Sequence, residues 1–399
     1  MGIAEVFGYD REGIILMTMG KIDLLKTISF GKRIAEEEID QLQNYFVSTE
    51  HWRRVYENMV DVIYGPKGSG KSAIYSILSQ KEDELFDRNI LLTSAENPRG
   101  NTVFEGLSID PPASEIEFIR LWKLYFIVIT SSIFDDYGIN NDKSKELKEI
   151  LSESKLVPPQ HGLKSILKTC LDYVRQFINI ESVQPGVNLN EVTGTPSGVN
   201  FKITFREPNA NEVKAGIKSI DYLYGILNES LKISNYSLWI VIDRLDVAFA
   251  EDIKLETNAL RALFKTYRDL APYNKIKLKI FLRDDIWNRI TKEGFREASH
   301  ITETLTINWD KDSILNLIIS RLLNNEKFIT FYSLTKMEVL SSLENQHKAF
   351  YCFFPKQIDL GEKKPSTLDW IISRVKDGKG IVAPREIWGK MEKMDTKVG

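Results

Sequence analysis

The chain has 399 residues, of which 43% are hydrophobic and 27% charged, and its formal net charge is −3. This composition is ordinary for a globular protein, and the charge gives no support for general binding to nucleic acid or anionic lipid. The two cysteines lack metal-ligand spacing, which predicts a cytoplasmic protein without disulfides or a zinc site. The length exceeds the roughly 150 residues typical of one domain, so we expect a large core with appended parts.

The hydrophobic pattern predicts no association with a membrane. The most apolar uncharged stretch, Leu124 to Phe134, is shorter than the about 18 residues that suggest a membrane span. Ser114 and Glu117 form a capping box ahead of it, so a buried helix is predicted instead. The apolar residues 13–19 are followed by charged residues and lack a small-residue cleavage site, which argues against a signal peptide.

Residues 1–59 are predicted to form an N-terminal helical arm, because apolar residues recur at near-helical intervals between 31 and 59. Within this arm, Phe46 and Trp52 could stack on a nucleobase, although aromatic residues at helical spacing more often belong to a core. The sequence is consistent with both interpretations.

The most informative segment is Gly65 to Ser72, which reads G-P-K-G-S-G-K-S and matches the phosphate-binding pattern G-x-x-x-x-G-K-[ST]. An apolar strand is predicted before it, from Val60 to Tyr64, and a helix after it, from Ser72 to Leu78. This strand–loop–helix context is the one in which the pattern binds phosphate groups. The sequence therefore predicts a site for a nucleoside triphosphate, expected to be ATP.

Each residue type in this phosphate loop has a physical role. The glycines let the backbone turn tightly, so that successive N–H groups point at an anion. Lys71 can reach the terminal phosphates, and the Ser72 hydroxyl is a suitable ligand for Mg²⁺. The residues expected to contact the nucleotide are Gly65, Pro66, Lys67, Gly68, Ser69, Gly70, Lys71, Ser72 and Ala73.

A second strand is predicted at Asn89 to Thr93, followed by a large and mainly helical insertion at about 101–235. Breaks between its helices are expected at 135–141 and at 157–159. A β-hairpin is expected over 187–206, because alternating apolar and polar residues follow a segment rich in glycine, proline and asparagine.

Two further strands are predicted, Leu238 to Ile242 and Ile276 to Leu282. The continuous apolar character of the first is typical of a parallel strand that is buried on both faces. Residues 60–304 are therefore predicted to form an α/β core, and residues 305–399 a C-terminal helical domain. The helices expected in this half of the chain include 257–270, 313–323 and 366–375.

Hydrolysis of a triphosphate also needs a carboxylate at the metal and a group that activates water. Asp243 ends an apolar strand, where α/β sheets present ligand-binding groups, so it is the predicted Mg²⁺ ligand beside Ser72. A simple turn-capping role is the alternative for Asp243. Asp246 is the candidate for water activation, and its alternative is a local ion pair with Arg244.

Arg283 ends the last predicted strand and is the candidate to contact the γ-phosphate, because a guanidinium binds phosphate through two parallel hydrogen bonds. Its strand is expected to lie between the strand of the phosphate loop and the strand of Asp243. The alternative for Arg283 is an ion pair with Asp284 or Asp285. Arg385 is either a second phosphate-sensing arginine from the helical domain or an ordinary surface residue.

The run Ile240-Val241-Ile242-Asp243-Arg244-Leu245-Asp246 resembles the second motif of STAND-type ATPases and their KAP-like relatives. Phe281-Leu282-Arg283 resembles the end of their sensor-1 strand. Trp309, a helix through Arg321 and Ala383-Pro384-Arg385-Glu386 resemble the helical region that follows in such proteins. The resemblance implies an ATPase of the P-loop class, and members of this wider group often act in antiphage defence.

Two departures from that pattern affect the prediction. Many ATPases of this division carry an acidic residue directly after the metal-binding aspartate, whereas this chain has Arg244 there. Turnover would therefore depend on Asp246. The second departure is the long interval between Ser72 and Asp243, which requires a large insertion between the loop and the second motif. Separately, Lys67 precedes Lys71 by four residues rather than the five of the ParA-like group, which argues against a ParA-like ATPase.

The sequence thus predicts a P-loop NTPase fold: a three-layer α/β sandwich with a mainly parallel sheet, a helical insertion with a β-hairpin, and a C-terminal helical domain. The expected function is an ATP-hydrolysing, Mg²⁺-dependent switch that works with a protein partner or by self-association. The alternative is a nucleotide-locked interaction module with little turnover. A small-molecule kinase is the third possibility, although no acceptor-site motif is visible.

Overall fold

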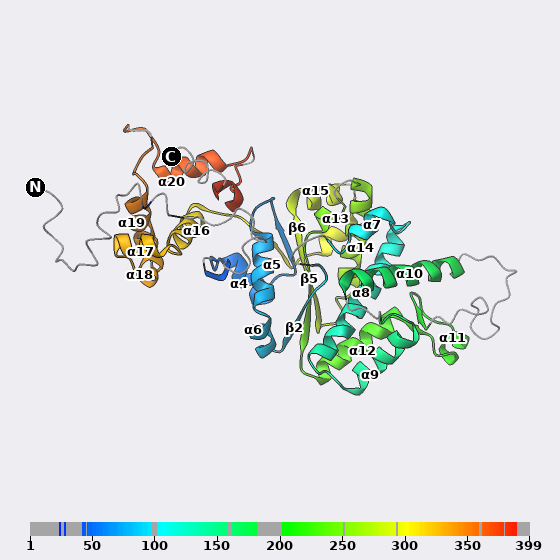
Figure 1. The fold of residues 1–399 in the computed structure, drawn as a ribbon. Helices are drawn as coiled ribbons and strands as arrows, with labels where there is room; N and C mark the ends of the chain where they lie inside the picture. Colours follow the sequence, from blue (N-terminus) through cyan, green and yellow to red (C-terminus); the bar gives the residue numbers. More distant parts are fainter. Residues whose placement is uncertain are drawn as a thin grey trace, which may run out of the picture. The chain divides into compact units, whose positions relative to one another are not determined.

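The computed structural model describes residues 24, 28, 42–44, 46–97, 102–157, 162–181, 202–249, 252–292, 294–358, 361–378 and 380–388, without the side chains of 180 and 181. The described chain is mostly helical and has an α/β fold (Figure 1). Its main sheet has five parallel strands in the order β2-β5-β6-β1-β7.

The strands of this sheet are β1 (Val62–Gly65), β2 (Ile90–Ser94), β5 (Ser237–Ile242), β6 (Ile276–Arg283) and β7 (Thr304–Thr306). The helices before β5 are α4 (Glu50–Tyr56), α5 (Lys71–Gln80), α6 (Glu82–Asp87), α7 (Glu105–Ile109), α8 (Glu115–Asp136), α9 (Asp142–Glu153), α10 (Leu163–Glu181), α11 (Ala210–Lys214) and α12 (Ile220–Ile233). The helices after it are α13 (Leu245–Ala248), α14 (Ile253–Asp269), α15 (Asp284–Lys292), the 3-10 helix η3 (Arg296–His300), α16 (Lys311–Leu322), α17 (Glu326–Tyr332), α18 (Lys336–Leu340), α19 (Leu343–Phe353) and α20 (Thr367–Val375).

The chain divides into two compact units, each with an apolar core of its own. The sheet unit contains Val55–Tyr64 and Leu78–Thr306. The second unit, called here the helical unit, combines Gly65–Ile77 and Ile307–Gly399 with the segment that ends at Arg54. The phosphate loop therefore belongs to the same compact unit as the C-terminal helices, although it follows β1 directly along the chain.

The strands predicted from apolar runs are confirmed, with boundaries that differ by one or two residues. β5 is the clearest case, because its residues from Leu238 to Ile242 are fully buried, as expected for a strand between two others and covered by helices. β7 was not expected, since residues after 305 were predicted to be helical. This edge strand has only three residues, too few to give a periodic signal.

The helix α8 is the buried helix expected from the apolar stretch, and it contributes the continuous run Leu124 to Ile129 to the core of the sheet unit. The Ser114 hydroxyl caps it by accepting a hydrogen bond from the Glu117 amide at 3.2 Å. The Trp122 indole donates to the Ala259 carbonyl of α14 at 3.0 Å, which fixes the two helices against each other. In Figure 1, α8, α12 and α14 lie to one side of the sheet and α6 lies to the other.

The expected hairpin at 187–206 falls mostly outside the described residues. Its described end forms a short strand, β3 (Ile203–Thr204), which pairs with β4 (Lys218–Ser219). This pairing is parallel, so β3 and β4 are not the two arms of a hairpin. The Tyr173 side chain of α10 holds β3, because its hydroxyl accepts from the Ile203 amide and donates to the Ile203 carbonyl.

The region after residue 307 is helical, as expected, and α16 to α20 pack around an apolar core. Of the predicted N-terminal arm, residues 42–44 and α4 are helical, and most of the rest lies outside the described residues. In the part of the chain that the structure describes, no helix has both the length and the apolar character needed to cross a membrane.

Candidate functional site

The phosphate loop follows β1 and leads into α5, which confirms the expected strand–loop–helix context. Gly68 and Gly70 have backbone φ angles of +82° and +100°, a region that side chains other than glycine rarely adopt. A Cβ atom at Gly65 would lie 2.4 Å from the Ser69 Oγ. Glycine is therefore favoured at Gly68 and Gly70 by the backbone conformation, and at Gly65 by close packing against Ser69.

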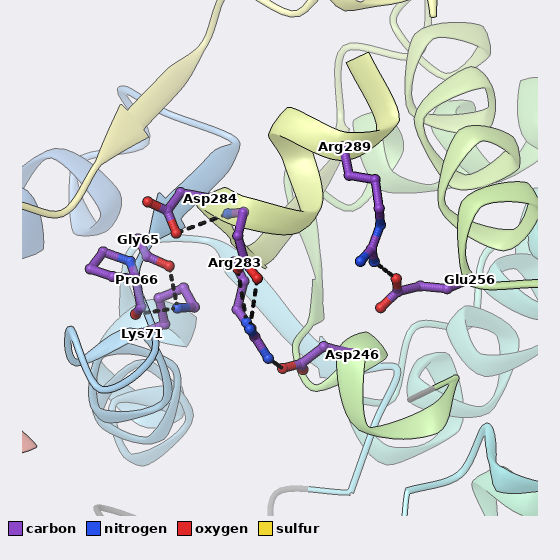
Figure 2. A network of polar contacts seen from close by, with 9 residues as sticks. Gly65, Pro66, Lys71, Asp246, Glu256, Arg283, Asp284 and Arg289 are labelled. Atoms are coloured by element: carbon purple, nitrogen blue, oxygen red, sulfur yellow. Dashed lines mark hydrogen bonds and ion pairs between the residues drawn. The ribbon is translucent and has the colours of Figure 1, made fainter. Parts of the chain in front are cut away.

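Lys71 is folded back onto the loop, and its side chain is largely buried. Its ammonium donates to the carbonyl oxygens of Gly65 at 2.7 Å and Pro66 at 3.0 Å (Figure 2). The Ser69 hydroxyl oxygen is buried and makes no hydrogen bond within the described structure. A cation held at the loop and an unsatisfied buried hydroxyl are features that suit an anionic ligand.

Two residues of the C-terminal region contact the same loop. The Trp309 indole N–H donates to the Ser69 carbonyl at 2.8 Å. The Arg385 amide lies 3.5 Å from the Gly68 carbonyl, and a Cβ at Gly68 would be only 2.8 Å from the Arg385 Cβ. The Arg385 Nε is buried and makes no hydrogen bond in the described structure. The residue considered as a second phosphate-sensing arginine thus lies at the phosphate loop.

Asp243 directly follows β5 in the sheet unit and is only 4% exposed. The next residue, Arg244, has a φ of +63°, which is uncommon for a residue other than glycine and occurs often at functional sites. Its guanidinium donates to the Asn97 carbonyl at 3.2 Å. Arg244 is the residue directly before α13, so the backbone turns between Asp243 and this helix.

Asp246 and Arg283 lie together in the sheet unit. The Arg283 Nη1 is 3.5 Å from the Asp246 Oδ2 (Figure 2). The Nε and Nη2 atoms of Arg283 donate to the Asp285 carboxylate at 3.0 and 2.7 Å. The hydrogen bonds to Asp285, followed by the nearby charges of Asp285 and Asp246, raise the pKa of Arg283. The alternative ion pair considered for Arg283 is therefore present with Asp285, and the described ion pair of Asp246 is with Arg283.

Glu96 was not singled out by the sequence, yet it is fully buried at the same edge of the sheet. Ser94 pairs with Val241 at the end of the two strands, and Glu96 and Asp243 each lie two residues beyond this pair along the chain. Its Oε1 accepts hydrogen bonds from the amides of Asn97 and Val103.

Burial raises the pKa of Glu96. The hydrogen bonds that its carboxylate accepts and the charge of Arg244 act to lower this pKa, but burial is the larger effect. The signal in the sequence was an acidic residue just after an apolar strand, the same signal that identified Asp243.

The predicted site residues fall into two groups. The residues of the phosphate loop lie in the helical unit, whereas Asp243, Asp246 and Arg283 lie in the sheet unit. The sheet order confirms that β6 lies between β1 and β5, as expected. Among the described residues no cluster of three or more histidine, cysteine or acidic side chains could hold a metal ion by itself.

Phe46 and Trp52, the two aromatic residues considered as a platform for a base, pack edge to face with ring centres 5.2 Å apart. Trp52 is buried. The two rings thus make a contact typical of a core.

Comparisons with known proteins give no relative: no protein-family model, no curated protein and no solved structure matches the chain. The resemblance to STAND-type and KAP-like ATPases consequently rests on the residues quoted for it.

Proposed function

We propose that this chain binds Mg-ATP and hydrolyses it, and that it acts as a nucleotide-dependent switch. The observation that carries the proposal is the geometry of the phosphate loop. Two glycines have positive φ angles, Lys71 is held at the loop, and the buried Ser69 hydroxyl has no hydrogen-bond partner in the described structure. This combination of a turned backbone, a cation and an unsatisfied donor at a helix N-terminus suits a phosphate group.

In the proposed role, Lys71 leaves the Gly65 and Pro66 carbonyls and binds oxygens of the β- and γ-phosphates. The Ser72 hydroxyl and the Asp243 carboxylate would be the hard oxygen ligands for Mg²⁺, and the ion when bound would neutralise charge on the phosphates. Asp243 is suited to this role because it follows a rigid, fully buried strand and therefore has a fixed position.

Hydrolysis requires attack by water on the γ-phosphorus, with cleavage of the bond to the bridging oxygen of ADP. We assign the proton of this water to the Asp246 carboxylate. Arg283 is the group that would neutralise charge on the γ-phosphate. For that purpose Arg283 has to exchange part of its pairing with Asp246 and Asp285 for the phosphate, which couples arrival of the nucleotide to release of a carboxylate.

The proposed fold is that of a P-loop NTPase, with a core at 60–304, an insertion at about 101–235 and a helical domain at 305–399. The setting that we propose, bacterial defence or signalling with a protein partner or a second copy of the chain, rests on the family resemblance alone. It implies that ATP occupancy changes which surface the protein presents.

The second candidate function is a nucleotide-locked interaction module that binds ATP or ADP with little turnover. The observation in its favour is the ion pairing of Arg283, whose guanidinium is shared between Asp246 and Asp285. If this pairing persists with ATP bound, the Asp246 carboxylate stays engaged with Arg283 and is not available to the attacking water.

The experiment that tests the proposal is calorimetric titration of the purified chain with Mg-ATP, followed by measurement of phosphate release. Lys71→Ala removes the cation of the loop and is expected to weaken ATP binding more than tenfold, roughly 1.4 kcal/mol. Lys81→Ala, which removes a lysine paired with Glu84 outside the loop, serves as the control and should bind like the wild type. Equal affinity of the Lys71→Ala variant would remove the assignment of the loop. ATP binding without phosphate release would favour the interaction module.

A further inference from the structure

The carbonyl groups of the phosphate loop are as informative as its amides. A loop that turns successive N–H groups toward an anion leaves the opposite carbonyl oxygens on its outer side, where they need donors of their own. Four such carbonyls have defined contacts in this chain. Lys71 supplies donors to those of Gly65 and Pro66, and the C-terminal region contacts those of Gly68 and Ser69.

Of the two contacts from the C-terminal region, the bond from Trp309 to Ser69 is shorter than that from the Arg385 amide to Gly68. At 2.8 Å it is a full-strength hydrogen bond between an indole N–H and a carbonyl. The indole also covers the next residue, because a Cβ at Gly70 would lie 3.8 Å from the Trp309 Cζ2, which is ordinary van der Waals contact. Trp309 therefore fixes both the orientation of the Ser69–Gly70 peptide and the space beside it.

The backbone around Trp309 connects this contact to a helix. Asp310 follows directly and caps α16, because its carboxylate accepts a hydrogen bond from the Ser313 amide at 2.7 Å. That bond, the largest cause, holds the pKa of Asp310 below its usual value. Beyond the cap, α16 buries Ile314, Leu315 and Ile318 in the core of the helical unit. A displacement of the Ser69 carbonyl would thus be passed through Trp309 and Asp310 to α16, which is packed in the core of the helical unit.

From these contacts we propose that Trp309 is a positioning residue of the phosphate loop, and that it transmits the nucleotide state of the loop to α16. The inference rests on the proposed binding of ATP at this loop. When Lys71 exchanges the Gly65 and Pro66 carbonyls for phosphate oxygens, the loop readjusts and the Ser69 carbonyl moves with it. Trp309 follows through its hydrogen bond, and the first turn of α16 changes its stability.

The test uses the full chain and the tryptophan emission, with hydrogen exchange as a second measurement. The wild type is expected to change its emission on addition of Mg-ATP and to gain protection in the first turns of α16. Trp309→Phe keeps an aromatic ring but removes the N–H donor. It is expected to lose most of the emission change, to lose the added protection in α16, and to bind ATP about three- to tenfold more weakly, as for loss of one hydrogen bond.

Trp370→Phe is the matched control, since Trp370 lies in α20 of the same unit and contacts Arg374. This variant should keep the emission change, the protection and the affinity. Melting curves of the two variants without nucleotide show whether either one has lost its fold.

The possible outcomes separate the two proposals. A wild type that fails to bind ATP in the calorimeter overturns the proposed function. A wild type that binds ATP without an emission change, or a Trp309→Phe variant with unchanged emission and α16 protection, overturns the role of Trp309 while leaving ATP binding intact.

Discussion

Lys279 has no exposed surface in the interior of β6, and its ammonium donates a hydrogen bond to the Asp61 Oδ1 at 2.8 Å. The Asn58 Oδ1 and the Val60 carbonyl, each at 2.6 Å, also accept from Lys279. Burial lowers the pKa of Lys279. Burial alone would raise the pKa of Asp61, but the charge and hydrogen bond of Lys279 hold it below its usual value. The strand β6 and the residue directly before β1 are therefore joined by a desolvated ion pair in which each partner depends on the other.

Lys279→Met is expected to lower the free energy of unfolding of the sheet unit by about 3–5 kcal/mol, because it leaves the Asp61 carboxylate buried without its cation. The double variant Asp61→Asn/Lys279→Met should lose much less than the sum of the two single variants. Urea denaturation followed by circular dichroism measures both quantities. Lys277→Met is the control: Lys277 is partly exposed and 3.5 Å from Asp61, so its removal should cost less than about 1 kcal/mol. Additive losses in the double variant would show that the pair is not coupled.

Asp243 and Asp246 are predicted to differ in what they contribute. Asp243→Asn removes a charge from the proposed Mg²⁺ ligand, so the dependence of ATP binding on Mg²⁺ should weaken. Asp246→Asn should leave binding unchanged but reduce turnover by roughly 10²-fold or more, the lower range for loss of an acid–base group. Calorimetry with and without Mg²⁺ and single-turnover phosphate release separate the two effects. Wild-type turnover in Asp246→Asn would mean that the proton acceptor is another residue.

Arg283 is predicted to distinguish ATP from ADP. Only ATP offers a γ-phosphate for which Arg283 could exchange its pairing with Asp246 and Asp285, and such differential affinity is what shifts a conformational equilibrium. Arg283→Ala should therefore reduce the preference for ATP over ADP more than it reduces affinity for ADP, and it should reduce ATP-induced protection of residues 311–388 in hydrogen exchange. Arg289→Ala is the control. Arg289 lies in α15, the helix directly after β6, but it is paired with Glu256. Equal losses for both nucleotides would show that Arg283 is structural.

Glu96 gives a prediction for pH dependence. Because burial raises its pKa in the folded state above the ordinary value, its protonated form stabilises the fold at low pH, and this stabilisation is lost as pH rises through the folded-state pKa. Glu96→Gln should consequently be more thermostable than the wild type at pH 7, and the difference should disappear toward pH 4.

Glu212→Gln is the matched control with the opposite sign. The hydrogen bonds from Arg206, the largest cause, lower the pKa of Glu212 despite burial, so this carboxylate stabilises the fold above its unfolded pKa and ceases to do so as pH falls. The variant should be less stable than the wild type at pH 7 and similar to it in acid. Melting temperatures between pH 4 and pH 8 measure both differences, and parallel curves for Glu96→Gln and the wild type would contradict the first prediction.

The sheet was largely predictable from the sequence, since buried parallel strands such as β5 are continuous apolar runs that end at polar or turn-forming residues. The phosphate loop was predictable because its residue types follow from the backbone it must adopt. β7 was missed, because a strand of three residues has no periodicity. The contact of Trp309 with Ser69 was also out of reach, because a hydrogen bond between segments 240 residues apart leaves no local pattern. The same holds for the relation between Glu96 and Asp243, each two residues beyond the pair Ser94 and Val241, because it depends on the register of two strands.

The order β2-β5-β6-β1-β7 also has a consequence for synthesis of the chain. β1 is the first of these strands to be made, yet its two neighbours in the sheet are the last. At ribosomal rates of about 5–20 residues per second, β1 precedes them by roughly 10–50 s. During that interval its apolar residues have no partner strand, which makes the nascent chain a substrate for chaperones and prone to aggregation. A product that terminates before Thr304 would retain the phosphate-loop sequence and β6 but lack β7, one of the two neighbours of β1 in the sheet.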